Sequence, residues 1–276
     1  MTRLLVLSGG GAKGSYEAGA VQALTHLKNR TYDGFYGVSA GALNASVLAC
    51  YGNDKEGASA LFQTWSSLKQ SDIYRFWKCW YFSLFWKNSL YDTAPLKQLI
   101  AKSISRDKLL SSGKMLAVQT VGLRSGNAKT FYHNDTDILD AVLASGSMPI
   151  YFPPVSMGTD LYVDGGVRNM VNLETALGTL PDEIDVVLTY PKHQKPYTCA
   201  SFSIIDIISR FIAISLMEIG KDDILIPELE SKIQDKTKIR IVRPSIDLDC
   251  DSLKFDHDQM MRAMDLGFMD ANKMEF

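Results

Sequence analysis

The chain has 276 residues, of which 46% are hydrophobic and 22% are charged, and its formal net charge is −2. This composition is typical of a folded globular protein and excludes an intrinsically disordered chain. Because basic residues do not outnumber acidic ones, the chain has no excess charge to neutralise phosphates, and we expect no nucleic-acid partner.

Apolar periodicity predicts strands and helices in alternation. Short apolar runs at 3–8 and 35–38 predict strands, and each is followed by a glycine-rich turn and a helical pattern. Further along, Thr93 predicts a helix N-cap with Pro95 in the first turn. The expected helices are 15–27, 42–51, 55–68, 137–144 and 256–271, and the later strands are 114–123, 128–132, 161–163, 185–190 and 238–243.

This alternation predicts an α/β sandwich around a mainly parallel sheet. The polar turn 124–127 (RSGN) predicts a hairpin between two of the strands. Since the sequence contains no repeat and no low-complexity linker, we expect one domain over 1–276.

Two apolar segments bear on membrane targeting. The N-terminal run 4–7 is about half as long as the apolar core of a secretory signal. The run 200–219 is interrupted by Asp206, Arg210 and Glu218, which favours a long, largely buried helix over a membrane span. We therefore expect no signal peptide and no transmembrane helix, and hence a cytoplasmic protein.

The cysteines are scattered without a C-x-x-C pair, at Cys50, Cys79, Cys199 and Cys250. Zinc sites and dense disulfide frameworks need closer and more regular spacing. We expect free, mostly buried thiols, no metal site and no cofactor.

The segment 9–14 (GGGAKG) joins the first predicted strand to the first helix and fits the pattern G-x-G-x-x-G. A dinucleotide site would need an acidic residue at the end of the second strand, but Asp33 precedes that strand. The order Lys13-Gly14 excludes a Walker A loop. Two interpretations remain: an ordinary tight turn, or backbone N–H groups that stabilise an anion at a helix N-terminus.

The segment 37–41 (GVSAG) fits the nucleophile elbow G-x-S-x-G, with Ser39 at its centre. In this motif a sharp turn between strand and helix exposes the serine hydroxyl, and the flanking glycines Gly37 and Gly41 leave room for it. The predicted strand before the motif and the small-residue helix after it provide the context that the motif requires.

A nucleophilic serine needs a base. None of the four histidines, His26, His133, His193 and His257, lies in a recognisable turn motif. An α/β-hydrolase also fits poorly, because that fold places several strands before its elbow, and here only the strand 3–8 comes before the one that leads to Ser39. The segment 163–166 (VDGG) places Asp164 at the end of a short strand, although Asp-Gly by itself is a common turn.

These three segments together resemble the patatin-like phospholipase family. The segment 32–45 is similar to the family's elbow and following helix, and 144–149 with 152–154 is similar to its A-S-x-A-x-P block, with Ser147 in place of alanine. Segments 90–96 and 266–268 also look familial, so the resemblance extends over 1–272. Asn169 or Asn172 matches the asparagine usual after the aspartate, but the proline that often follows it is absent.

The resemblance implies a three-layer α/β/α sandwich and a lipid acyl hydrolase of the phospholipase A or lysophospholipase type. It implies Ser39 as nucleophile and Asp164 as base in a dyad without histidine, acting on a phospholipid or other acyl-lipid substrate through an acyl-enzyme. Lys13 would contact an anionic headgroup or be a solvated turn residue. The implied oxyanion loop comprises Gly9, Gly10, Gly11, Lys13 and Gly14, and the base motif includes Gly165 and Gly166.

The segment 74–91 is unusually aromatic: nine of its 18 residues are aromatic, and its charges Arg75, Lys78 and Lys87 are positive. This composition is typical of an interfacial membrane segment. If the segment is helical, Phe82 and Trp86 lie on the face opposite Ile73. We expect a lid or interfacial segment at about 72–91 that brings the protein transiently to membrane surfaces, with Trp77, Phe82 and Trp86 as candidate lipid contacts.

Other interpretations remain open. The aromatic segment would also suit a core helix or an oligomer contact, and the sequence leaves the oligomeric state open. A nucleotide-binding oxidoreductase would use the first glycine loop but leaves Ser39 and Asp164 unexplained. A lipid-binding protein without catalytic activity would not need both Ser39 and Asp164.

Overall fold

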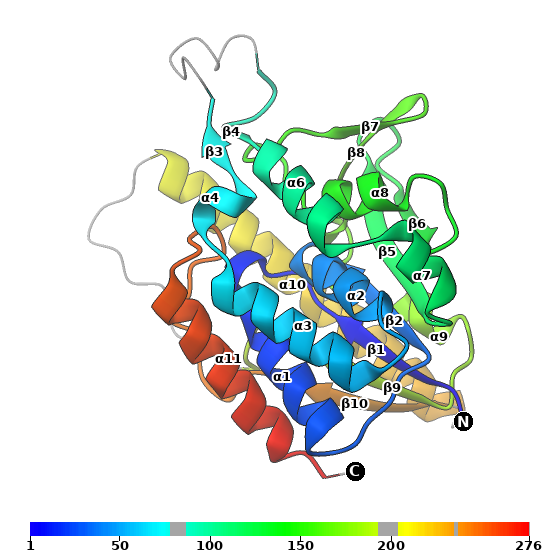
Figure 1. Ribbon diagram of the computed structural model, residues 1–276. Helices are drawn as coiled ribbons and strands as arrows, with labels where there is room; N and C mark the ends of the chain where they lie inside the picture. Colours follow the sequence, from blue (N-terminus) through cyan, green and yellow to red (C-terminus); the bar gives the residue numbers. More distant parts are fainter. Residues whose placement is uncertain (78–86, 193–203, 235–236, 276) are drawn as a thin grey trace.

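A computed structural model describes residues 1–77, 87–192, 204–234 and 237–275. Its centre is an eight-stranded sheet with the strand order β10-β9-β1-β2-β5-β8-β7, and β6 also pairs with β5 (Figure 1). The strands are β1 (Arg3–Leu7), β2 (Gly34–Val38), β5 (Met115–Gly122), β6 (Ala128–Tyr132), β7 (Val155–Met157), β8 (Asp160–Asp164), β9 (Glu183–Val187) and β10 (Lys238–Val242).

The strands from β10 to β5 run parallel, whereas β6, β7 and β8 form antiparallel pairs at the other side of the sheet. The prediction of a mainly parallel α/β sheet is therefore confirmed. The hairpin predicted around 124–127 is also confirmed, since β5 and β6 flank this turn.

Helices cover both faces of the sheet. They are α1 (Ser15–His26), α2 (Ala40–Ala49), α3 (Asp54–Ser67), α4 (Gln70–Ile73), α6 (Ala94–Ser103), α7 (Arg106–Ser111), α8 (Ile138–Ser145), α9 (Leu173–Leu177), α10 (Ile204–Gln234) and α11 (His257–Asn272), with short 3₁₀ turns η1 (Gly11–Gly14) and η2 (Gly165–Val167).

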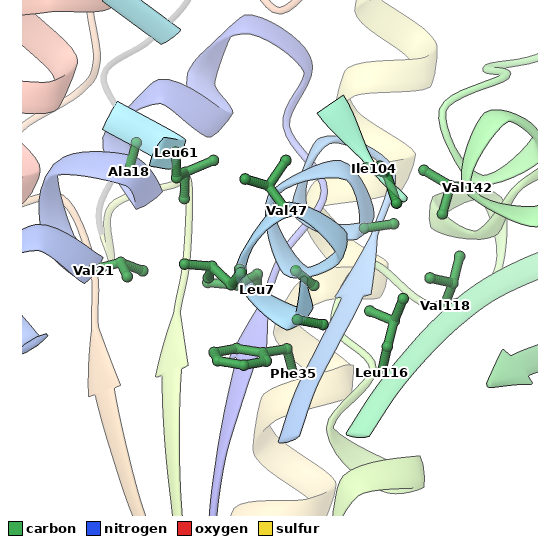
Figure 2. Packing of buried hydrophobic residues seen from close by; sticks show 14 of the residues in the cluster. Leu7, Ala18, Val21, Phe35, Val47, Leu61, Ile104, Leu116, Val118 and Val142 are labelled. Atoms are coloured by element: carbon green, nitrogen blue, oxygen red, sulfur yellow. The ribbon is translucent and has the colours of Figure 1, made fainter. Parts of the chain in front are cut away.

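Alternate residues of the central strands belong to two separate cores, because successive side chains of a strand point to opposite faces. Leu5 and Leu7 of β1 pack with α1, α2, α3 and α11, whereas Leu4 and Val6 pack with α9 and α10. Figure 2 shows the first core, with Leu7 and Phe35 beside Val47 of α2. The molecule is thus a three-layer α/β/α sandwich.

Two details differ from the expectations. The helical alternative for 73–86 is wrong at its beginning, because β3 (Arg75–Phe76) pairs with β4 (Tyr91–Asp92) in a small hairpin that projects from the sandwich (Figure 1). The helix predicted at 200–219 forms within α10 but is not largely buried: Ile207, Phe211 and Ile214 are 55%, 70% and 48% exposed. Its first half packs only one side against the protein, so the other side meets solvent.

Among the residues that the structure describes, no helix has the length and apolar character needed to cross a membrane. Cys50 and Cys250 are buried and free, as predicted. Cys79 and Cys199 lie outside the described residues.

Candidate active site

Ser39 occupies the turn between β2 and α2, in a backbone conformation with φ 55° and ψ −124°. A positive φ is unfavourable for a residue with a side chain and marks a strained position that its surroundings must hold in place. Gly41 packs closely against β1, and only a glycine fits there, because a Cβ would lie 2.4 Å from the carbonyl oxygen of Leu7. Gly37 is equally confined: a Cβ would lie 2.3 Å from the carbonyl oxygen of Gly41. Both glycines of the elbow let α2 begin directly against the end of β1.

Strand β5 brings the elbow and the aspartate together. Val38, which precedes Ser39, pairs with Gln119, and Asp164 pairs with the next residue, Thr120. Gly165 is needed at this junction because a Cβ would lie 2.4 Å from the carbonyl oxygen of Gln119. Two motifs far apart in the sequence therefore meet beside consecutive residues of one strand.

Asp164 is completely buried. Its Oδ1 accepts a hydrogen bond of 2.8 Å from the Gly166 N–H, and its Oδ2 forms no hydrogen bond of normal geometry within the described part of the chain. Burial raises the pKa of Asp164 to about 7, and the Gly166 N–H and the nearby Ser39 hydroxyl counteract part of that shift. A carboxylate that is half protonated near neutral pH can accept and return a proton.

The loop that contains η1 lines the same cavity as Ser39 and Asp164. Gly9 donates its N–H to the carbonyl of Met170 and Ala12 donates to Ser252, both at 2.9 Å. The N–H groups of Gly10 and Gly11 donate to no other atom within the residues described, and both glycines line the same cavity as Ser39. Among the described loop glycines, only Gly10 and Gly11 therefore both line the cavity and have an N–H that donates to no protein atom.

Close packing and the cavity wall also constrain single positions of this loop. Gly11 has φ +58°, and a Cβ there would meet the carbonyl oxygen of Ser252 at 2.1 Å. Gly14 lies against the first turn of α2, since a Cβ would be 2.8 Å from that of Ala40. Lys13 lies at the wall of the cavity.

A buried network of hydrogen bonds connects the end of the 9–14 loop to α1, α2 and α3. Asn44 of α2 donates to Glu17 of α1 at 2.8 Å and to the carbonyl of Gly14 at 3.0 Å, and it accepts from the Trp65 indole at 2.8 Å. Burial raises the pKa of Glu17 well above its usual range. Neither Glu17 nor Asn44 was expected from the sequence, although an acidic side chain and an amide among mostly small and apolar neighbours indicate a buried polar contact.

The site opens into a cavity of about 1080 Å³, which is at the upper end of the usual range for small-molecule sites. One end is polar and contains Ser39 and Asp164. The walls toward α2, α3 and α6 are mostly apolar, which suits a long hydrocarbon chain, whereas α10 and the loop 247–254 also contribute charged side chains. The apolar lining residues include Leu43, Val47, Leu61, Leu68, Leu96, Leu99, Ile100, Ile104, Ile212 and Leu216.

Both ends of the aromatic segment reach this cavity, since Tyr74 and Tyr91 line it with ring centroids 4.5 Å apart. Trp77 is half-buried; its indole N–H donates to Ser89 at 3.2 Å, and the Lys87 ammonium lies 4.6 Å from its ring centroid. Phe82 and Trp86 lie outside the described residues. The lid remains a prediction.

Exposed apolar side chains of α10 lie beside residues that line the cavity, and this part of its rim is called the mouth below. Residues of α10 on either side of Phe211 line the cavity, while Phe211 itself is exposed. The Tyr151 hydroxyl forms a hydrogen bond with the hydroxyl of Ser209 in α10. Ile150, which precedes Tyr151 in the chain, is exposed and has φ +75°. A positive φ is rare for a β-branched residue.

In the part of the chain that is described, no three His, Cys, Asp or Glu side chains are grouped as a metal site requires.

The fold and this site define an α/β protein with a serine at a strained elbow beside a buried carboxyl group. A family model described as patatin-like phospholipase matches residues 5–177, a range that includes the 9–14 loop, Ser39 and Asp164. The chain therefore belongs to the patatin-like phospholipase family. The familial segment suggested at 266–268 lies beyond the matched range.

A curated relative is the probable lipid hydrolase 463L of Invertebrate iridescent virus 6, which is 25% identical over 184 residues, covering 63% of each protein. Similar solved structures are VipD from Legionella pneumophila, with 15% identity and a TM-score of 0.46, and the type III effector ExoU of Pseudomonas aeruginosa, with 17% identity and a TM-score of 0.46. The matches cover 98% of this chain but 66% of VipD and 52% of ExoU. The chain thus spans less than two thirds of these relatives.

Proposed function

We propose that this protein is a serine carboxylic-ester hydrolase that cleaves acyl lipids through a Ser39–Asp164 dyad. The observation that carries the proposal is the Asp164 carboxyl group: it is buried beside Ser39, its pKa is raised to about 7, and among the described residues its Oδ2 accepts no hydrogen bond of normal geometry. A structural aspartate would have both oxygens hydrogen-bonded. A general base needs a free oxygen and a pKa near the working pH.

In the acylation step, Asp164 Oδ2 takes the hydroxyl proton as Ser39 Oγ attacks the ester carbonyl carbon. The carbonyl oxygen becomes an oxyanion, which the N–H groups of Gly10 and Gly11 stabilise. When the tetrahedral intermediate collapses, the bond from carbon to the alcohol oxygen breaks. Asp164 returns its proton to that oxygen, and the acyl group stays on Ser39.

Deacylation repeats these steps with water. Asp164 takes a proton from the water as its oxygen attacks the acyl carbon, and the same two N–H groups hold the second oxyanion. Collapse releases a carboxylic acid, and the proton on Asp164 passes to Ser39 Oγ. No histidine takes part in either step.

The substrate class follows from the cavity. Its apolar walls accept a fatty acyl chain, and its polar end holds the ester, so we assign a phospholipase A or lysophospholipase type of reaction. Two exposed apolar residues support transient contact with a membrane surface: Phe211 at the mouth, and Phe76, whose ring contacts that of the lining residue Tyr91. Such contact lets a lipid pass into the cavity without crossing water.

The test combines turnover of a p-nitrophenyl ester with labelling by a fluorophosphonate, which reacts with activated serines. The wild type should hydrolyse the ester and carry one label on Ser39, identified by peptide mass spectrometry. Ser39→Ala should lose both properties, and Ser67→Ala, a change at an exposed serine of α3, should keep both. Turnover by Ser39→Ala close to that of the wild type would refute the dyad. A folded wild-type protein that binds vesicles but neither turns over nor is labelled would point to a lipid-binding protein.

A further inference from the structure

Asp223 of α10 lies against the loop that follows the base motif. Its Oδ1 accepts a hydrogen bond of 3.2 Å from the side-chain amide of Asn169, and its Oδ2 accepts one of 3.0 Å from the backbone N–H of Val171. The backbone N–H of Met170 also interacts with this carboxylate. One side chain from a distant helix thus binds both ends of the 169–171 loop.

This loop touches both halves of the candidate site. The carbonyl of Met170 accepts the Gly9 N–H at 2.9 Å, which anchors the start of the oxyanion loop. The Met170 side chain also fills the space beside two glycines: a Cβ at Gly9 would lie 3.1 Å from its methyl group, and one at Gly166 would lie 2.9 Å from its sulfur. A shift of residues 169–171 would therefore displace the oxyanion loop and the base motif together.

A second chain of hydrogen bonds leads from the loop to the nucleophile. Asn169 Oδ1 accepts from the Gln119 side chain at 2.9 Å, and the carbonyl of Gln119 accepts from the Ser145 hydroxyl at 2.7 Å. Ser145 in turn accepts the backbone N–H of Ser39 at 2.9 Å. Asp223 is thus connected to Ser39 through groups that are all hydrogen-bonded.

We propose that Asp223 is a positioning residue, whose carboxylate holds the 169–171 loop so that the Gly10 and Gly11 donors, Asp164 and Ser39 keep their relative places. The proposal rests on the proposed function, because it concerns the geometry of that reaction. A carboxylate suits this place since it only accepts hydrogen bonds, and bonds from N–H groups to a charged oxygen are stronger than bonds between neutral groups.

The donor and acceptor pattern makes the role testable. In Asp223→Asn the new amide turns an N–H₂ group either toward the Asn169 amide or toward the Val171 N–H, so two donors face each other. Exchanging the two residue types, Asp223→Asn with Asn169→Asp, restores the pattern. The new amide at 223 can accept from Val171 and donate to the new carboxylate at 169, which still accepts from Gln119.

The experiment measures kcat and KM for a short soluble ester, together with the rate of fluorophosphonate labelling. Asp223→Asn should lower kcat and the labelling rate by about 10- to 100-fold, with KM changed by less than about threefold, because misplacement affects the transition state more than binding. The exchanged pair should recover most of this loss. Asp222→Asn, the same change at the exposed neighbouring residue, should stay within about twofold of the wild type.

Each outcome bears on one proposal. An Asp223→Asn protein with wild-type kcat and labelling rate overturns the positioning role, as does a folded exchanged pair that recovers nothing. If Asp223→Asn alone does not fold, as judged by circular dichroism, the exchanged pair still decides: wild-type kcat supports the role, and a low kcat refutes it. A wild-type protein that neither turns over nor is labelled refutes the proposed function instead.

Discussion

Ser39 and Asp164 meet because one strand pairs with both of their segments: β5 pairs Gln119 with Val38, the residue before Ser39, and pairs the adjacent Thr120 with Asp164. The elbow strand β2 runs parallel to β5, and β8 runs antiparallel to it. Both segments therefore end at the same point along β5. Backbone pairing sets the separation of the two side chains before any side-chain contact is considered.

The first prediction concerns pH. The proposed base Asp164 can accept a proton only when it is ionised, and burial raises its pKa to about 7. The value of kcat/KM for a soluble ester should therefore rise about tenfold for each pH unit below 7 and level off above it. A pH series at constant ionic strength measures this. A profile that is flat from about pH 5 to pH 8 would contradict the assignment of Asp164 as the base.

The second prediction is that Asp164→Asn stabilises the fold while abolishing activity. Because the folded protein binds the Asp164 proton more tightly than the unfolded chain, the native state loses stability as the pH rises from about 4 through 7. At about 1.4 kcal/mol for each pKa unit, the ionised buried group costs roughly 4 kcal/mol at pH 8. The neutral amide avoids this cost and can still accept from Gly166.

Urea unfolding of the wild type and of Asp164→Asn at pH 5 and pH 8 tests this. The advantage of the variant should be larger at pH 8 and should shrink toward pH 5. A variant that is less stable at pH 8 would indicate that the ionised carboxylate contributes to folding, contrary to the observed burial.

The third prediction concerns the elbow glycine. In Gly41→Ala the new methyl group would lie 2.4 Å from the Leu7 carbonyl oxygen, so α2 must move away from β1. Such overpacking should cost about 1–3 kcal/mol of stability. Activity should fall by about 100-fold, because Ser39 moves relative to Gly10 and Gly11.

Gly178→Ala provides the control for this change. Gly178 has φ −60°, and the nearest atom to a Cβ there is 3.5 Å away, so alanine fits without strain. We expect full activity and equal or slightly higher stability. Thermal unfolding and ester turnover of both variants are the measurements, and equal losses in the two would rule out the close approach at Gly41 as the cause.

The fourth prediction concerns the membrane. Phe211→Ser with Ile207→Ser removes two exposed apolar side chains from α10 near the cavity mouth, and we expect about a tenfold loss of vesicle binding. Turnover of a short soluble ester should stay within about twofold of the wild type. Cosedimentation with phospholipid vesicles measures the binding.

Leu180→Ser is the matched control, because Leu180 is 71% exposed and precedes the amino end of β9, whereas Ser39 follows the carboxyl end of the parallel strand β2. This variant should bind vesicles like the wild type. If it loses as much binding as the α10 variant, the contact is not specific to the mouth of the cavity.

The fifth prediction concerns acyl-chain length. Val47 lies on α2, two turns beyond Ser39, and lines the apolar part of the cavity. Val47→Phe should reduce turnover of long-chain p-nitrophenyl esters by about tenfold, while turnover of the butyrate ester stays within about twofold. A chain-length series provides the measurement, with the melting temperature as a check on packing. An equal loss for all chain lengths would indicate a general disturbance of the core.

The three motifs could be found in the sequence because each is contiguous and each follows a strand. The 9–14 loop, the elbow around Ser39 and the 163–166 segment carry their own glycines, and those glycines match the close approaches seen in the fold. The helices and strands around them were also predictable, because apolar periodicity is a local property.

Other features depended on contacts between distant segments. Nothing near Asp223 in the sequence indicates that α10 holds the 169–171 loop. Phe211 belongs to an apolar run that reads as buried, yet one side of α10 meets solvent. The sequence also suggested several glycines as oxyanion donors, and the fold showed that Gly9 already donates its N–H to Met170.

The sequence by itself therefore determined the α/β class, the family resemblance and the identity of the candidate dyad, because these reside in local patterns of residue types. Only the tertiary structure decided which N–H groups of the 9–14 loop lack a partner among the described residues, how far the pKa of Asp164 is raised, and which residues surround the cavity. Each of these depends on what packs against a group, and burial and pairing arise from segments that the chain brings together only when it folds.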